Sequence, residues 1–249
     1  MSERAIAVIQ ARMTSTRLPR KVMLPLEGAT VVARVIERAQ RIPGIDGVCL
    51  AIPDGAAHAE LATIARAAGA AVAVGSETDV LGRYLAAAAE TRADIVVRVT
   101  SDCPLIDPGV SGAVLALLRN SVADYTRTSI ATGYPLGLDT EAIRTHVLAT
   151  AAAESQDPYE REHVTPFIWR RPERFPYLLL DRIPNRRAWR LTLDTAPDYE
   201  LIRRIYAALQ PTDARFDFAA IERLLLVHPD WLAINADVGH TPIVGWPKG

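Results

Sequence analysis

The chain has 249 residues, of which 49% are hydrophobic, and its formal net charge is −1. This length and apolar content are enough for one large α/β domain or two small ones with a real core, and they exclude a disordered chain. The near-zero net charge argues against bulk electrostatic binding to nucleic acid or to an anionic membrane.

The cysteine content and the apolar segments bear on the cellular compartment. Two cysteines, Cys49 and Cys103, are too few for a disulfide framework, and neither lies in a CxxC motif. No segment approaches the roughly 20 apolar residues of a membrane span, and the first residues lack the apolar stretch of a signal peptide. We therefore expect a cytoplasmic protein without a membrane partner.

Short runs rich in Val and Ile alternate with longer segments of helical periodicity over the first half of the chain. Strands are predicted at 5–9, 47–52, 71–75, 94–100 and 123–128, and helices at 29–42, 58–69, 79–92 and 108–120. This alternation, with strands that are apolar throughout, predicts a largely parallel sheet covered by helices on both faces. The carboxyl ends of its strands should meet along one edge, where ligands bind in such sheets.

The pattern changes after about residue 130. A turn-rich stretch, "ATGYPLGLDTEAI", is followed by a predicted helix at 141–154. "YLLLDRI" and "WRLTLDT" then alternate like strands, and "APDYELIRRIYAAL" and "DFAAIERLLLVHPDWL" have the periodicity of amphipathic helices. Because no Ser/Gly linker or repeat interrupts the chain, we expect a single domain over 1–249, in which 130–190 forms a subregion for acceptor binding or dimerisation.

A basic loop, "QARMTSTRLPRK", directly follows the first predicted strand. Arg12, Arg17 and Lys21 offer charged donors to phosphate oxygens, and Ser15 and Thr16 add hydroxyl groups. The loop contains neither GxxxxGK[ST] nor GxGxxG, so it is not a Walker loop or a dinucleotide fingerprint. It fits a polyanion site, although a solvated basic loop has the same composition.

Two carboxylates follow predicted strands further along the chain. In "RVTSDCPLIDP", Asp102 comes just after the fourth strand, while Asp107 precedes a proline and fits a helix cap. Asp194 ends the strand-like run "WRLTLDT". Mg2+ takes one or two carboxylates together with substrate phosphates, so Asp102 and Asp194 are candidate metal ligands if the fold brings them together. A turn or cap aspartate remains the alternative for each.

The segments "IQARMTSTRLPRKVMLPLEG", "GSETDVLGRY", "RVTSDCPLIDP" and "LTLDTAPDYELI" occur in the order found in cytidylyltransferases. The chain resembles the group that includes the CMP-KDO and CMP-sialic acid synthetases. "YPLGLDTEAI" and "REHVTPFIW" resemble the branch of spore-coat polysaccharide proteins such as SpsF. The resemblance covers nearly the whole chain, and the first of these motifs is the most specific.

The resemblance implies a Rossmann-like, GT-A-like nucleotidyltransferase fold: a three-layer α/β sandwich with a mostly parallel sheet and an inserted α+β subregion. It also implies CTP as co-substrate, Mg2+ as cofactor and a homodimer. The residues that match the nucleotide site of the family are Gln10 and Ala11 at the base, Arg83 near the nucleoside, and Arg12, Ser15, Arg17 and Lys21 at the phosphates. Asp102 and Asp194 match its metal ligands, and Lys21, Arg12 and Asp102 are the candidate catalytic residues.

The candidate acceptor site lies in the later segments and is less specific. Its residues are Tyr134, Asp139, Arg161, Glu162 and His163. A sugar acid or a related small acidic acceptor would suit Arg161, but each of these side chains also fits a structural or solvated role. Two other functions stay open. One is a nucleotide-sugar-dependent glycosyltransferase, although the region around Asp102 lacks a D-x-D motif. The other is a non-catalytic nucleotide-binding protein of a polysaccharide pathway.

Overall fold

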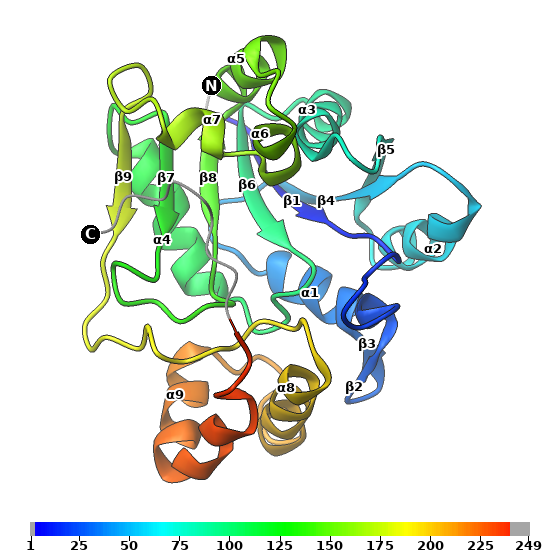
Figure 1. The fold of residues 1–249 in the computed structure, drawn as a ribbon, viewed down its shortest axis with the longest axis vertical. Helices are drawn as coiled ribbons and strands as arrows, with labels where there is room; N and C mark the ends of the chain where they lie inside the picture. Colours follow the sequence, from blue (N-terminus) through cyan, green and yellow to red (C-terminus); the bar gives the residue numbers. More distant parts are fainter. Residues whose placement is uncertain (1–2, 240–249) are drawn as a thin grey trace.

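The computed structural model describes residues 3–239, and a seven-stranded sheet runs through them in the order β5-β4-β1-β6-β8-β7-β9 (Figure 1). The strands are β1 (Ala5–Gln10), β4 (Gly47–Pro53), β5 (Ala71–Gly75), β6 (Ile95–Thr100), β7 (Tyr125–Thr128), β8 (Glu141–Arg144) and β9 (Tyr177–Leu180). Neighbouring strands are parallel except where β8 pairs with β6 and β7. The predicted mostly parallel sheet is therefore confirmed.

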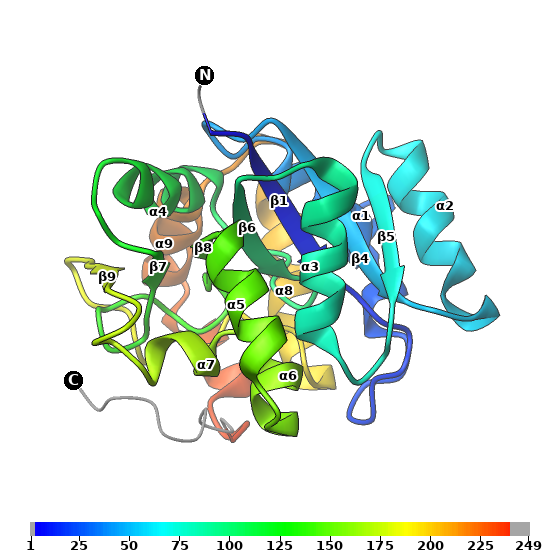
Figure 2. The same ribbon diagram turned by 90° about the horizontal axis from the view of Figure 1, so that it is seen from above.

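Helices cover both faces of the sheet (Figure 2). On one face lie α1 (Val31–Ala39), α2 (Ala59–Ala67) and α4 (Pro108–Arg119); on the other lie α3 (Val80–Thr91), α5 (Thr145–Glu154), α6 (Pro158–His163) and α7 (Pro166–Trp169). Alternate residues of a strand point to opposite faces. Accordingly, Ala5, Ala7 and Ile9 of β1 join one core and Ile6 and Val8 join the other. The result is the expected three-layer α/β architecture.

Side-chain caps fix the start of two helices near the sheet edge. Asp79 accepts a hydrogen bond from the backbone of Gly82 at the start of α3, and Asp107 accepts one from Val110 at the start of α4. The prediction that Asp107 caps a helix is confirmed, and Asp79 has the same role at α3. Asp107 also accepts from the backbone N–H of Phe218, 2.6 Å away, and so ties α4 to a C-terminal helix.

The C-terminal segment forms an additional layer, outside the three-layer sandwich, that packs beneath the edge of the sheet (Figure 1). It consists of α8 (Ala196–Leu209), α9 (Phe218–Val227) and a 3-10 helix, Pro229–Asn235, and a small hairpin of β2 (Pro25–Leu26) and β3 (Ala29–Thr30) packs beside α8. This layer shares a core with Leu191 and Leu193, which flank the candidate site. Within residues 3–239, no helix has the length and apolar character needed to cross a membrane.

In the second half of the chain, α8 spans the predicted helix "APDYELIRRIYAAL", but other sequence-based boundaries there were wrong. Residues 141–144, predicted as the start of a helix, form β8, because pairing with both β6 and β7 satisfies their backbone groups. Among residues 3–239, the run at 189–195 joins no strand ladder and makes one isolated bridge, between Leu136 and Arg190. Helix α9 ends at Val227, where the following residues continue as a 3-10 helix that begins with a proline.

Gly137 explains why the turn-rich stretch can lie against the run that carries Asp194. Its φ is +105°, and a Cβ atom there would lie 2.4 Å from the backbone of Leu191. The backbones also exchange hydrogen bonds, from Leu136 to Trp189 and from Leu191 to Leu136. The absent side chain thus permits a close approach that positions the segment leading to Asp194.

Candidate active site

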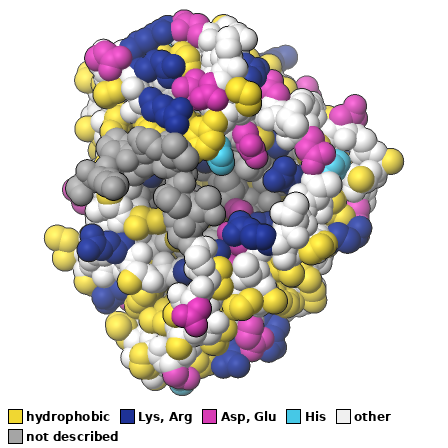
Figure 3. All heavy atoms as spheres, viewed as in Figure 1, with side chains coloured by type: hydrophobic (Ala, Val, Ile, Leu, Met, Phe, Trp, Pro, Cys, Tyr) yellow, Lys and Arg dark blue, Asp and Glu magenta, His cyan; other side chains and the backbone are white. Residues whose placement is uncertain are grey.

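A cavity of about 300 Å³ opens at the carboxyl ends of β1 and β6. It is lined by Gln10, Ala11, Arg12, Ser15, Thr16, Arg17, Lys21, Val22, Val80, Arg83, Arg98, Thr100, Ser101, Asp102, Glu162, His163 and Asp194. Figure 3 shows basic and acidic side chains together around a hollow in the middle of this face. Basic side chains outnumber acidic ones in the lining, so the cavity favours a polyanion.

The loop after β1 is held in shape by its backbone. The N–H groups of Ser15 and Arg20 both donate to the carbonyl of Met13, and the N–H of Met13 donates to Nδ1 of the buried His58, 3.3 Å away. The loop then enters a 3-10 helix, Lys21–Met23, whose Val22 is 1% exposed. This anchoring places Ser15 and Lys21 in the cavity wall, from a loop whose composition alone allowed a solvated segment.

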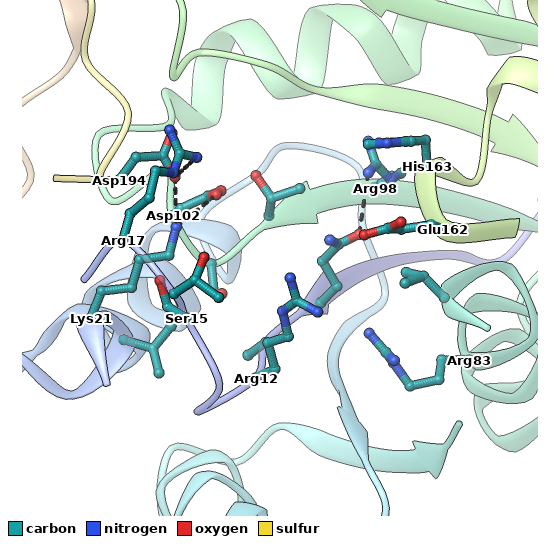
Figure 4. Close-up of a pocket in the computed structure, with 17 residues that line it drawn as sticks. Arg12, Ser15, Arg17, Lys21, Arg83, Arg98, Asp102, Glu162, His163 and Asp194 are labelled. Carbon is teal, nitrogen blue, oxygen red and sulfur yellow. Dashed lines mark hydrogen bonds and ion pairs between the residues drawn. The ribbon is translucent and has the colours of Figure 1, made fainter. Parts of the chain in front are cut away.

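Lys21 connects the loop to the two candidate metal ligands. Its Nζ lies 3.1 Å from Oδ2 of Asp102 and 2.8 Å from Oδ1 of Asp194, and it donates to the carbonyl of Leu193 at 2.8 Å (Figure 4). Burial lowers the pKa of Lys21, but the two carboxylates outweigh burial and raise it. Burial likewise raises the pKa of Asp102, while Lys21 and Thr100 outweigh it and lower that pKa. Lys21 and Asp102 are therefore both charged at neutral pH.

A buried network fixes the position of Asp194. Nη2 of Arg190 lies 3.1 Å from Oδ2 of Asp194, and the same guanidinium forms a two-pronged contact with Asp198, at 2.8 and 3.0 Å. Asp198 is fully buried and also accepts the N–H of Asp194 and a bond from Asn235. Thr195, rather than Asp194, caps α8. The carboxylate of Asp194 is therefore left to face the cavity.

The other end of the cavity holds Arg83, Arg98, Glu162 and His163, with Arg12 between the two ends (Figure 4). Arg83 is buried on α3 and donates to the backbone carbonyls of Ser76 and Glu77. Arg98 on β6 donates to Oε1 of Gln10 at 3.2 Å. Because arginine only donates, the amide oxygen of Gln10 must face Arg98, which leaves its NH2 group as a separate donor.

Two arginines of this site, Arg98 and Arg190, were not predicted from the sequence. Arg98 interrupts the apolar run "DIVVRVT". Because a buried charge is costly unless it is paired, a charged residue inside a strand that is buried on both faces could have indicated this position. Arg190 lies in "WRLTLDT", where its contacts with Asp194 and Asp198 depend on how α8 begins. No spacing in the sequence indicates those contacts.

Arg98 is held by a buried carboxylate whose removal should destabilise the fold. Glu141 is 5% exposed and accepts from Arg98, from Tyr125 and, at 3.0 Å, from Thr165. We expect Glu141→Gln to lower the free energy of unfolding by about 3 kcal/mol at neutral pH, because it leaves Arg98 without its counter-charge. Urea denaturation measures this change. Glu90→Gln, at an exposed position, is the matched control.

We also expect the effect of Glu141→Gln on the free energy of unfolding to depend on pH. Burial raises the pKa of Glu141, but Arg98 and Arg127 outweigh it and lower the pKa below the usual 4.5. The stabilisation is therefore complete above pH 4.5 and is lost as the pH falls through the lowered value. The difference in unfolding free energy between wild type and Glu141→Gln should shrink in acid. A difference that is small at neutral pH, or that grows in acid, would contradict this assignment.

The five candidate acceptor residues do not lie together. Glu162 and His163 line the cavity. Arg161 lies outside its lining and pairs with Asp79 at 2.6 Å, which holds α6 against α3. Tyr134 is buried in the hydrophobic core that also contains residues of α8 and α9, and Asp139 accepts from the backbone of Gly137 at 2.8 Å; neither belongs to the lining.

The donor set around Lys21 fits a hard divalent cation. Within residues 3–239, no group of three or more His, Cys, Asp or Glu side chains could hold a metal by itself. Mg2+ does not require one, because it keeps several waters and usually takes one or two carboxylates plus substrate phosphates. Asp102 and Asp194 supply two carboxylates on either side of one ammonium group.

Comparison with known proteins identifies the family. The family model described as "Cytidylyltransferase" matches residues 6–223. The chain belongs to the cytidylyltransferase family. Among its relatives, the spore coat polysaccharide biosynthesis protein SpsF of Bacillus subtilis (strain 168) is 30% identical over 229 residues, which cover 89% of this chain and 92% of SpsF.

Further similarity lies within the same family. A 3-deoxy-manno-octulosonate cytidylyltransferase of Anaeromyxobacter dehalogenans (strain 2CP-1 / ATCC BAA-258) is 36% identical over 118 residues, or 46% of this chain and 47% of that enzyme. The solved structure of a cytidylyltransferase from Leptospira borgpetersenii serovar Hardjo-bovis (strain JB197) has a TM-score of 0.89 and 28% identity, covering 96% of this chain and 100% of that one. The predicted family and Rossmann-like nucleotidyltransferase fold are thus confirmed.

Proposed function

We propose that this cytidylyltransferase transfers CMP from CTP to an acidic sugar or a related acceptor and releases pyrophosphate, in the synthesis of a surface polysaccharide or glycan precursor. The observation that carries the proposal is the cavity in which the basic loop after β1 and two carboxylates from distant segments face one space. The named activity of the Anaeromyxobacter relative supports CTP and a sugar-acid acceptor, and SpsF supports the pathway.

The phosphates of CTP would bind at the Lys21 end of the cavity. Arg12 and Arg17 are exposed, and their planar guanidinium groups suit phosphate oxygens. Ser15 adds a hydroxyl donor from the same loop, and Lys21 adds a compact charge. At the opposite end, the NH2 group of Gln10, the backbone of Ala11 and the guanidinium of Arg83 would border the nucleoside.

In the reaction, an acceptor oxygen bonds to the α-phosphorus while the bond from that phosphorus to the bridging oxygen breaks, and pyrophosphate leaves. Negative charge grows on the departing oxygens, so Arg12, Arg17 and Lys21 would assist by stabilising it. Asp102 and Asp194 would hold Mg2+, which when bound supplies a Lewis acid to the phosphate oxygens. The remaining contribution of the protein is to hold donor and acceptor in line.

Glu162 and His163 are the acceptor candidates that border the same space as the phosphate loop. Burial lowers the pKa of His163, and Arg98 and Arg170 lower it further against the opposing effect of Glu162. The imidazole is therefore neutral at pH 7 and keeps one nitrogen free to accept a hydrogen bond or a proton from an acceptor hydroxyl. We also propose that 130–190 contributes acceptor or dimer contacts within a single domain.

A pyrophosphate-release screen tests the proposed function. The protein is incubated with Mg2+, each of the four nucleoside triphosphates, and a panel of acidic sugars that includes a 3-deoxy sugar acid. We expect release only with CTP and with one acceptor class. Release from no pair, together with transfer from a nucleotide sugar, would instead indicate a glycosyltransferase. Tight CTP binding without release for any acceptor would indicate a non-catalytic nucleotide-binding protein.

A further inference from the structure

The ammonium group of Lys21 occupies the space between the two candidate metal ligands. Its three N–H groups have three acceptors: Oδ2 of Asp102, Oδ1 of Asp194 and the carbonyl of Leu193, all within 3.1 Å. A lysine ammonium has three donors, so none is left for another ligand. The side chain is 13% exposed, which limits competition from water.

The charges around this space are already balanced by the protein itself. Asp194 also lies 3.0 Å from Nη2 of Arg17 and 3.1 Å from Nη2 of Arg190. A divalent cation placed between Asp102 and Asp194 would therefore sit directly beside the charge of Lys21. Two cations in contact at a partly buried site repel each other strongly. The arrangement thus disfavours a metal for as long as Lys21 stays in place.

We propose that Lys21 is a built-in counter-cation that excludes a divalent metal from the nucleotide-free protein and yields its place when nucleotide phosphates bind. This inference rests on the proposed function, because the phosphates of CTP are the anion that would draw the flexible side chain away. Once Lys21 moves, Asp102 and Asp194 are exposed to a cation that the same phosphates also ligate.

The proposal makes nucleotide and metal binding mutually dependent. A ligand that removes Lys21 from the carboxylates must raise the affinity for the metal, and by linkage the metal must raise the affinity for that ligand by the same factor. Metal alone would bind weakly, because it would first have to break the contacts of Lys21 with the two carboxylates, which costs free energy. The two carboxylates would then bind metal tightly only when the substrate is present.

The test measures Mn2+ binding to the nucleotide-free protein by electron paramagnetic resonance, for wild type, Lys21→Met and Lys21→Arg. Methionine keeps the length of the side chain without its charge, whereas arginine keeps the charge. We expect Lys21→Met to bind Mn2+ at least tenfold more tightly than wild type, and Lys21→Arg to stay within about threefold of wild type. Adding Asp102→Asn to Lys21→Met should remove the gained affinity, which locates the site.

Equal Mn2+ affinity in wild type and Lys21→Met would overturn the proposal, and so would the absence of Mn2+ binding in a folded Lys21→Met. Circular dichroism checks the fold, and Lys21→Gln replaces Lys21→Met if that variant does not fold. The experiment contains no nucleotide and no turnover. Its failure would therefore leave the proposed function intact, while failure of the pyrophosphate screen would leave this binding result unaffected.

Discussion

Asp102→Asn should reduce the rate of pyrophosphate release at least a hundredfold while the fold stays intact. The variant removes a negative charge that faces Lys21 at 3.1 Å and that we propose to hold Mg2+. Losing one such electrostatic contact typically costs about 3 kcal/mol of transition-state stabilisation. The backbone carbonyl of Asp102, which accepts from Leu193 at 2.7 Å and from Thr192 at 3.1 Å, is unchanged by the substitution.

Steady-state pyrophosphate release with CTP and the acceptor found in the screen measures this effect. Asp237→Asn is the matched control, because Asp237 is exposed and has no hydrogen bond or ion pair with another residue of the described part of the chain. It should retain wild-type turnover. Near-normal turnover in a folded Asp102→Asn variant would show that Asp102 has no essential role in the reaction.

Lys21→Met should also lower turnover by about a hundredfold or more, although it is expected to bind Mn2+ better than wild type. The lost ammonium would stabilise charge on the departing pyrophosphate, a contribution of about 3 kcal/mol for a well-placed donor. Opposite effects on metal affinity and on turnover separate this role from simple misfolding. Turnover is measured at saturating Mg2+, so that weak metal binding does not limit the rate.

The neighbouring cation provides the control for Lys21. Arg20 lies one residue earlier, pairs with Glu60 at 2.8 Å and does not line the cavity. Arg20→Met should therefore keep turnover within about twofold of wild type. If Arg20→Met and Lys21→Met lost turnover equally, the effect would come from the loop as a whole, and the specific contribution of Lys21 would be refuted.

The sheet and its helices could be predicted from sequence where local pattern and tertiary packing agree. β1, for example, is apolar on both faces, and both of its neighbours are parallel strands of the same kind. Residues 141–144 were not predicted as a strand, because they form one only through pairing with residues 95–98 and 125–127. A segment of four residues that are both polar and apolar has no strand pattern from which such pairing could be predicted.

In the candidate site, too, some features could be predicted from the sequence and others depend on tertiary contacts. The loop motif and Asp102 stand out because polar residues follow directly after apolar strands. The proximity of Asp102 to Asp194 did not follow from the sequence, because the contact depends on a backbone hydrogen bond between Leu193 and Asp102, 2.7 Å long, across 91 positions of chain numbering. The network of Arg190 with Asp198 likewise exists only once α8 has docked.

A crystal structure of the protein with CTP and Mn2+, with the metal located by its anomalous signal, tests the central claim most directly. We predict a Mn2+ ion between the carboxylates of Asp102 and Asp194, ligated by the triphosphate, with the ammonium of Lys21 moved onto a phosphate oxygen. An anomalous peak away from both aspartates, or a triphosphate bound outside the loop after β1, would contradict the account.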